Sequence, residues 1–216
     1  MKRSIYNKLM KMDNTVLNIL SIHARNDFLD KVMPKITYCN DYGQIYILFA
    51  AIILWKNSLA AFLNILLALA LGLTCGEGLF KHVFKRKRPL ITENNFTLLI
   101  KFPDSFSFPS GHTTSSFAVL GVTWYMNLQF KYFILVLAIL IAFSRLYLYV
   151  HYPSDIVGGI VLGFICAFIS IKISSHISLI KLLYANAMPE HKWNIYLFKI
   201  SELRLITHQL ISNNLL

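Results

Sequence analysis

Charged residues are scarce in this chain: they make up 14% of its 216 residues, whereas soluble domains carry roughly a quarter. Hydrophobic residues reach 56%, and the mean hydropathy is +0.55. This composition argues against a water-soluble domain and indicates a single domain embedded in a lipid bilayer.

Cysteines are few, and internal repeats are absent. The three cysteines, Cys39, Cys75 and Cys166, do not have metal-ligand spacing, and two of them lie inside apolar segments. We therefore interpret them as small buried hydrophobes, which leaves the redox compartment open. The basic residues after Met1 are not followed by an uninterrupted apolar run, so we expect no cleavable signal peptide.

Acidic residues are few as well: 10 Asp and Glu stand against 21 Lys and Arg, for a formal net charge of +11. A basic chain suits nucleic acid, anionic lipid or an anionic substrate. Because the basic residues lie beside apolar segments rather than along a soluble face, we expect no nucleic-acid partner. The expected partners are the bilayer and an anionic molecule at its surface.

The apolar segments predict an all-α integral membrane bundle of about five transmembrane helices, since a helix needs about 20 apolar residues to cross the hydrocarbon. The expected spans are residues 42–55, 59–80, 110–128, 132–149 and 154–173. We divide the chain into an N-terminal basic helical segment (1–41), a transmembrane catalytic domain (42–175) and an amphipathic tail (176–216).

Outside these spans, residues 13–38 carry apolar side chains at helical spacing. This pattern predicts one or two helices that either lie in the membrane interface or pack as ordinary amphipathic helices. Pro34 is expected to break or kink the second one. Residues 91–108 form the longest polar connection and predict a loop over the site, and residues 199–210 are compatible with an amphipathic helix.

Three short polar motifs stand at the ends of apolar segments, and the first is Lys81, six residues, then Arg88 and Pro89. Pro89 ends the helix and fixes Arg88 at its exit. Glu77 lies one helical turn before Lys81 and can orient its ammonium group. A basic run can also be a positively charged membrane flank. We assign that plainer role to the intervening residues Lys85, Arg86 and Lys87.

The second motif is Pro109, Ser110, Gly111 and His112, which opens a helix. Ser110 is placed to be the N-cap, and the free N–H groups at the positive helix end form an anion site. Gly111 allows the backbone to approach a phosphate oxygen, and His112 would reach a leaving-group oxygen. The alternative is an interfacial histidine beside a helix cap.

The third motif is Ser144 and Arg145, followed by His151 and Asp155. An unpaired Arg145 would be costly near the membrane. His151 and Asp155 can meet on one helical face or across the bend at Pro153. A carboxylate bonded to one ring nitrogen would leave the other nitrogen as a nucleophile. The alternative is a structural His–Asp pair that caps the last span.

The alternation of spans brings all three motifs to one membrane face, because the second and fourth spans end where the third and fifth begin. The combined site holds three cations, two histidines and a carboxylate, an inventory that suits cleavage of a phosphate ester without a metal. The spacing of histidines and acids matches neither a zinc site nor a two-metal centre, so we expect no metal and no cofactor.

In this order and spacing the three motifs resemble the signature of the type 2 phosphatidic acid phosphatase superfamily, over about residues 59–163. The resemblance implies a metal-independent lipid phosphatase in which His151 is the nucleophile that forms a phosphohistidine. Asp155 would orient His151, and His112 would be the general acid. The resemblance also implies a clamp on the phosphoryl oxygens, made of Lys81, Arg88, Ser110, Gly111 and Arg145.

The lipid itself is not specified by the sequence. We favour undecaprenyl diphosphate, because the N-terminal segment is similar to that of small bacterial members that recycle this carrier. Phosphatidic acid and phosphatidylglycerol phosphate follow closely, and lipid A phosphate is a third option. The other hypotheses are a lipid phosphotransferase that uses the same phosphohistidine and a non-catalytic binder of anionic lipid. Nothing in the sequence indicates the oligomeric state.

The resemblance implies a multi-pass protein of the inner or plasma membrane with its site on the extracytoplasmic face. The positive-inside rule indicates the opposite, because the motif face also carries the basic N-terminus with Lys2, Arg3, Lys8 and Lys11. We follow the resemblance, since some of these charges can serve phosphate binding or interfacial anchoring.

Overall fold

The computed structural model describes residues 2–56, 58–89 and 98–187 of the chain. The chain divides into two compact units, Met1–Lys172 and Ile173–Leu216. All regular elements in the described residues are helical, which confirms the predicted class. The proposed tail helix at residues 199–210 lies outside the described residues.

In the described part of the chain, two helices precede the bundle and six follow them. They are α1 (Lys2–His23), α2 (Asp27–Tyr38), α3 (Gln44–Trp55), α4 (Leu59–Leu73), α5 (Phe80–Phe84), α6 (Gly111–Tyr125), α7 (Lys131–Tyr147) and α8 (Pro153–Ala187). A short 3₁₀ turn, Asp41–Gly43, links α2 to α3, and a π-helical turn, Thr74–Leu79, links α4 to α5.

Every predicted span contains a helix, but the helices differ in length and polarity. Among the described residues, two helices are long and apolar enough to cross a membrane, Leu59–Phe84 and Pro153–His176. The helix α6 is shorter, and its Ser and Thr residues lower its hydropathy. The number of five spans therefore stays a prediction.

Three predictions about where helices end differ from the structure. Pro89 was expected to end the helix directly after Arg88, but α5 already ends at Phe84, because Lys85 takes a left-handed backbone conformation with a φ of 47°. The last span was expected to end near residue 173, but α8 continues to Ala187. Pro34 was expected to break or kink the second N-terminal helix, and the break does not occur, because α2 runs through Pro34 to Tyr38. Its neighbours Met33 and Thr37 are buried, and this tertiary packing holds the helix together across the proline.

The helix α6 lies at the centre of the bundle and is approached closely by its neighbours. It packs against α4 and α7, and nearly all of its side chains are buried. A Cβ atom added to Gly163 of α8 would stand 2.7 Å from the carbonyl oxygen of Thr114. The glycines of α8 therefore permit the close helix contact that is common in membranes, and this contact fixes the start of α6.

The outer faces of α7 and α8 are apolar. Large hydrophobic side chains are exposed there: Phe133, Val136, Ile139 and Leu140 on α7, and Val157, Val161, Phe164, Ile165 and Phe168 on α8. Such a surface is unfavourable in water over this extent and suits contact with lipid.

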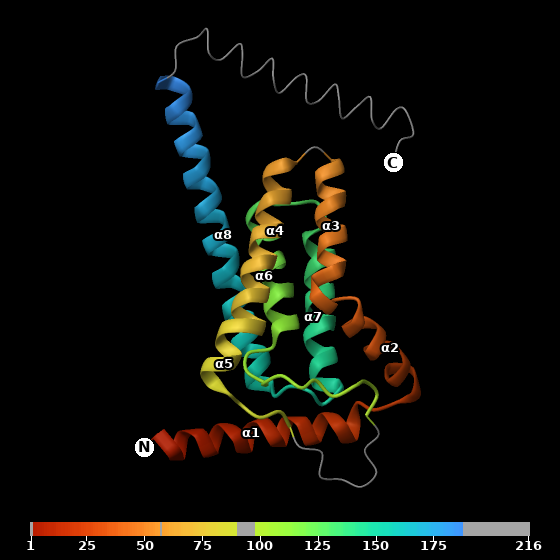
Figure 1. Cartoon of the computed structure of the whole chain (residues 1–216). Helices are drawn as coiled ribbons and strands as arrows, with labels where there is room; N and C mark the ends of the chain where they lie inside the picture. The colour runs from red at the N-terminus through yellow and green to blue at the C-terminus, as the bar shows by residue number, and fades with distance from the viewer. Residues whose placement is uncertain (1, 57, 90–97, 188–216) are drawn as a thin grey trace. The chain divides into compact units, whose positions relative to one another are not determined.

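The helix α1 lies across the end of the bundle at which α7 ends and α8 begins (Figure 1). Its Asp13 is buried and accepts hydrogen bonds from the backbone N–H and the hydroxyl of Ser154, at 2.9 and 2.5 Å. Leu17 is fully buried, whereas Met12 and Ile19 are exposed. One face of α1 thus packs against the bundle, and both interpretations of its sequence stay predictions.

Candidate active site

A cavity of about 550 Å³ lies at the end of the bundle where α7 ends and α8 begins. Six of the eight predicted site residues line it: Lys81, Arg88, Gly111, His112, Arg145 and His151. The other two, Ser110 and Asp155, are fully buried and do not line it. The structure therefore brings the three sequence motifs together, as the alternation of spans predicted.

The Lys81 ammonium group is buried at the cavity wall, with 1% of the residue exposed. Its Nζ donates hydrogen bonds to Glu77 Oε2 at 2.5 Å and to Ser105 Oγ at 2.9 Å. The first contact is the one that the spacing of Glu77 and Lys81 predicted. The second comes from the loop before α6, which lines the cavity from Ile100 to Ser105.

The Arg88 guanidinium group bridges the loop and the third motif. Its Nη1 donates to the Val150 carbonyl oxygen at 2.6 Å and lies 3.1 Å from His151 Nε2, while its Nε donates to the Ser105 carbonyl oxygen at 2.7 Å. Burial lowers the pKa of Arg88 to about 10, and the charges of Glu77 and Asp155 oppose this shift. The guanidinium group is therefore still positive at neutral pH.

Arg145 of α7 is the third cation, with 4% of the residue exposed. Its Nη1 donates a short hydrogen bond to Thr37 Oγ1 of α2. Within the described part of the chain no carboxylate pairs with Arg145, and its buried Nε has no hydrogen-bond partner. A buried guanidinium group with unused donors is a favourable site for an anion.

His151 lies in the turn before α8 and is 1% exposed. Burial lowers its pKa well below the usual value, and the nearby positive charges of Arg88, Arg145 and Lys81 act in the same direction. The imidazole is therefore neutral at physiological pH. Neutral imidazole keeps a lone pair on one ring nitrogen, which is what a nucleophile needs.

The predicted partner, Asp155, lies close to His151, but the predicted hydrogen bond is not made, and other groups hold the carboxylate. Its Oδ2 lies 3.5 Å from His151 Nδ1. The same oxygen accepts the backbone N–H of Tyr152 at 2.8 Å and a short hydrogen bond from the Ser107 hydroxyl. Asp155 is thus fixed from three directions, Arg86 being the third, and its negative charge faces the Nδ1 side of the ring.

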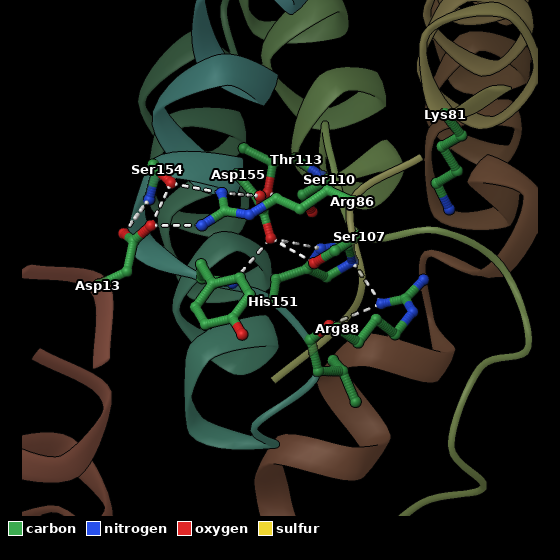
Figure 2. Close-up of polar contacts among 12 residues, drawn as sticks. Asp13, Lys81, Arg86, Arg88, Ser107, Ser110, Thr113, His151, Ser154 and Asp155 are labelled. Carbon is green, nitrogen blue, oxygen red and sulfur yellow. Dashed lines mark hydrogen bonds and ion pairs between the residues drawn. The ribbon is translucent and has the colours of Figure 1, made fainter. Parts of the chain in front are cut away.

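Arg86, which the sequence led us to assign to a membrane flank, belongs instead to the site (Figure 2). Its Nη1 donates to Asp155 Oδ1 at 2.6 Å, and its Nη2 donates to Asp13 Oδ2 at 2.6 Å. The guanidinium group also lies over the Tyr152 ring, 4.2 Å from its centroid. Lys85 and Lys87 are exposed, as a flank requires. The sequence feature that could have indicated this role of Arg86 is Asp13, because it is the one acidic residue in the segment that forms α1.

Ser110 and Gly111 shape the start of α6. Ser110 is the N-cap: its Oγ accepts the Thr113 N–H at 3.4 Å, which confirms the predicted cap. The Ser110 N–H donates to the Asp155 carbonyl oxygen at 3.1 Å, so it is already used. Gly111 is required by a close neighbour, because a Cβ atom there would stand 1.7 Å from Glu77 Oε1.

His112 has a carboxylate partner that the sequence did not reveal. Its Nε2 lies 2.9 Å from Oδ1 of Asp41, in the 3₁₀ turn after α2. The neighbouring Asn40 donates from its Nδ2 to the His112 carbonyl oxygen at 3.0 Å. Both partners precede His112 by more than 70 positions, so no local pattern could indicate them.

A helical bundle with three buried cations around a neutral histidine defines an anion site suited to a phosphoryl group. The comparison with protein families gives the class. The model of the PAP2 superfamily matches residues 61–178, more than half of the chain, and the chain belongs to this family.

Two relatives carry the name undecaprenyl-diphosphatase, one of them as a putative enzyme. The chain is 33% identical over 120 residues to the putative undecaprenyl-diphosphatase YbjG of Escherichia coli K12, which covers 53% of this chain and 60% of that protein. It is 28% identical over 149 residues to an undecaprenyl-diphosphatase of Sulfolobus acidocaldarius, covering 64% of this chain and 68% of that one. The chain thus spans between half and two thirds of the length of its E. coli relative.

Two crystal structures share the fold. One is Aquifex aeolicus LpxE, with a TM-score of 0.62 and 27% identity, covering 74% of this chain and 95% of that one. The other is a transmembrane PAP2-type phosphatidylglycerolphosphate phosphatase of Bacillus subtilis, with a TM-score of 0.64 and 25% identity, covering 79% and 88%. These neighbours confirm the helical fold, which this chain shares with membrane phosphatases of the family, and they leave the substrate open.

Proposed function

We propose that this protein is a metal-independent membrane lipid phosphatase that works through a phosphohistidine on His151. The observation that supports this most directly is the position of His151: a neutral imidazole at the cavity wall, with its Nε2 3.1 Å from the Arg88 guanidinium group. Arg88 can stabilise the charge that develops on the phosphoryl oxygens, and so can Lys81 and Arg145.

The reaction has two balanced steps. First, the lone pair of His151 Nε2 attacks phosphorus, the bond to the leaving oxygen breaks, and His112 gives that oxygen a proton. Asp155, whose Oδ2 lies 3.5 Å from Nδ1, stabilises the positive charge that the ring acquires. Water then attacks phosphorus, His112 takes a proton from it, and the P–N bond electrons return to Nε2 as phosphate leaves.

The favoured substrate is undecaprenyl diphosphate. Both relatives described above carry undecaprenyl-diphosphatase in their names, whereas the two structural neighbours carry other names. Phosphatidic acid, phosphatidylglycerol phosphate and lipid A phosphate are the other candidates. We further propose that the protein is multi-pass in the inner or plasma membrane, with the cavity on the extracytoplasmic face.

The test is phosphate release by the detergent-purified protein in EDTA, from undecaprenyl diphosphate, phosphatidic acid, phosphatidylglycerol phosphate and lipid A. We expect release from at least one lipid, no release by His151→Ala, and normal release by His23→Ala, which alters an exposed histidine. A phosphorylated alcohol in place of free phosphate would indicate a phosphotransferase. Full turnover by His151→Ala would refute the assigned nucleophile, and loss in EDTA that added metal restores would refute the metal-free reaction.

A further inference from the structure

The carboxylate of Glu77 stands at the start of α6, where an anion is expected to bind. A Cβ atom on Gly111 would lie 1.7 Å from its Oε1 and 2.5 Å from its Cδ. Its other oxygen accepts the Lys81 ammonium group at 2.5 Å. The side chain lines the cavity and is 42% exposed, so it has room to move. Glu77 belongs to the π-helical turn Thr74–Leu79, a feature often found at functional sites.

The charges around the cavity explain why a carboxylate lies there. Lys81, Arg88 and Arg145 are 1%, 6% and 4% exposed, and buried charges are costly without a partner. Within the described residues, the only ion pair made by any of the three is that between Lys81 and Glu77.

Two other carboxylates at the site, Asp155 and Asp41, have different partners. Asp155 pairs with Arg86 at 2.6 Å, and Asp41 contacts His112 at 2.9 Å. The negative charge of Glu77 also acts on both Arg88 and Arg145, whereas Asp155 acts on Arg88 and Asp41 acts on Arg145. Glu77 is thus the one carboxylate in the described chain that faces all three cations, and they remain short of negative charge.

We propose that Glu77 is a resident counter-ion of the phosphate clamp. It occupies part of the phosphate site in the free protein and moves toward the open cavity when a phosphoryl group binds. This role rests on the proposed function, because it requires that the clamp binds phosphate. This role and a role limited to orienting Lys81 predict opposite effects of removing the Glu77 charge. Removing the charge of a competitor strengthens phosphate binding, whereas removing an orienting group weakens it.

The decisive variant is Glu77→Gln, which keeps the shape of the side chain and removes its charge. The probe is inorganic phosphate, measured as an inhibitor of lipid hydrolysis. We expect its inhibition constant to fall about tenfold, because two like charges about 5 Å apart repel appreciably in a partly buried site. The KM for the lipid should fall in parallel, while kcat changes less.

Two controls isolate the charge and its place. Asp104→Asn removes an exposed carboxylate that lines the same cavity and should change phosphate inhibition by less than about twofold. Glu77→Asp keeps the charge and should stay near wild type. Thermal unfolding gives an independent readout. Without phosphate, Glu77→Gln should melt below wild type because Lys81 loses its counter-ion, and saturating phosphate should restore most of the difference.

The outcomes separate this inference from the proposed function. If phosphate inhibits Glu77→Gln no better than wild type, or less well, Glu77 only orients Lys81 and the inference is wrong. If wild type neither hydrolyses a lipid phosphate nor gains thermal stability from inorganic phosphate, the clamp does not bind phosphate and the proposed function fails as well.

Discussion

Arg86 offers the sharpest test of how the site is built. The perturbation is Arg86→Gln, which keeps a polar side chain but removes the guanidinium group from between two carboxylates. The side chains of Arg86, Asp13 and Asp155 are 10%, 3% and 0% exposed. The variant would therefore leave two buried carboxylates without their cation, in surroundings where solvent compensates little.

The magnitude follows from the contacts that are lost. Arg86 makes two hydrogen bonds to carboxylates, each at 2.6 Å, and bonds to charged groups contribute about 1.5–3 kcal/mol each. In other proteins, removing one partner of a buried ion pair costs about 3–5 kcal/mol of stability. For a chain of this size, a loss of about 4 kcal/mol lowers the melting temperature by roughly 10 °C.

The assay is thermal unfolding in detergent, together with kcat at a temperature where the variant is folded. Because Asp155 faces His151, a small displacement of the carboxylate should lower kcat by about a hundredfold. Lys85→Gln is the matched control, since Lys85 is an exposed neighbour in the same basic run, and it should leave both quantities unchanged. In a double-mutant cycle, Arg86→Gln and Asp13→Asn should couple by at least about 1 kcal/mol. A melting temperature and kcat like those of Lys85→Gln would refute the assignment of Arg86 to the site.

Three further expectations concern protonation, leaving groups and orientation. The pKa of His151 is lower in the folded than in the unfolded protein, so the unfolded chain binds the extra proton first as the pH falls. Stability should therefore decrease as the pH drops from about 6.5 toward the folded-state pKa. Melting temperatures measured against pH should lose this dependence in His151→Ala. Asp41→Asn should slow lipids with alcohol leaving groups about tenfold or more relative to p-nitrophenyl phosphate, because a carboxylate on His112 favours its protonated, acidic form; equal slowing of both substrates in kcat measurements would contradict this. A reporter fused after Leu216 should be cytoplasmic, since the five predicted spans would place the tail opposite the cavity; an extracytoplasmic signal would reverse the proposed orientation.

Runs of apolar residues predicted where the helices lie, but they did not predict the residues at which the helices end. Composition marks where the hydrocarbon ends, near residue 173, but a helix ends where its backbone is interrupted. Residues 174–187 contain neither glycine nor proline, so α8 continues to Ala187. At Pro34 the predicted break does not occur, because the burial of Met33 and Thr37 outweighs the lost hydrogen bond.

Within the site, contacts over one helical turn were predictable and long-range contacts were not. The pairing of Glu77 with Lys81 follows from their spacing of four residues, and the Ser110 cap follows from its place before α6. The partners Asp13 and Asp41 lie 73 and 71 positions from Arg86 and His112. Their pairing depends on how helices pack, and a sequence pattern carries no record of that.

These long-range contacts share an origin, and it changes how the site should be delimited. The family match begins at residue 61, yet a residue before position 61 holds a side chain in each of the three motifs. Asp13 binds Arg86 in the first motif, Asp41 contacts His112 in the second, and Thr37 accepts a hydrogen bond from Arg145 in the third. Groups that fix the side chains of a phosphate site determine its geometry as much as the side chains themselves. The N-terminal helices are therefore part of the site, and a protein truncated before α3 would lose the alignment of all three motifs even though the family motifs remained intact.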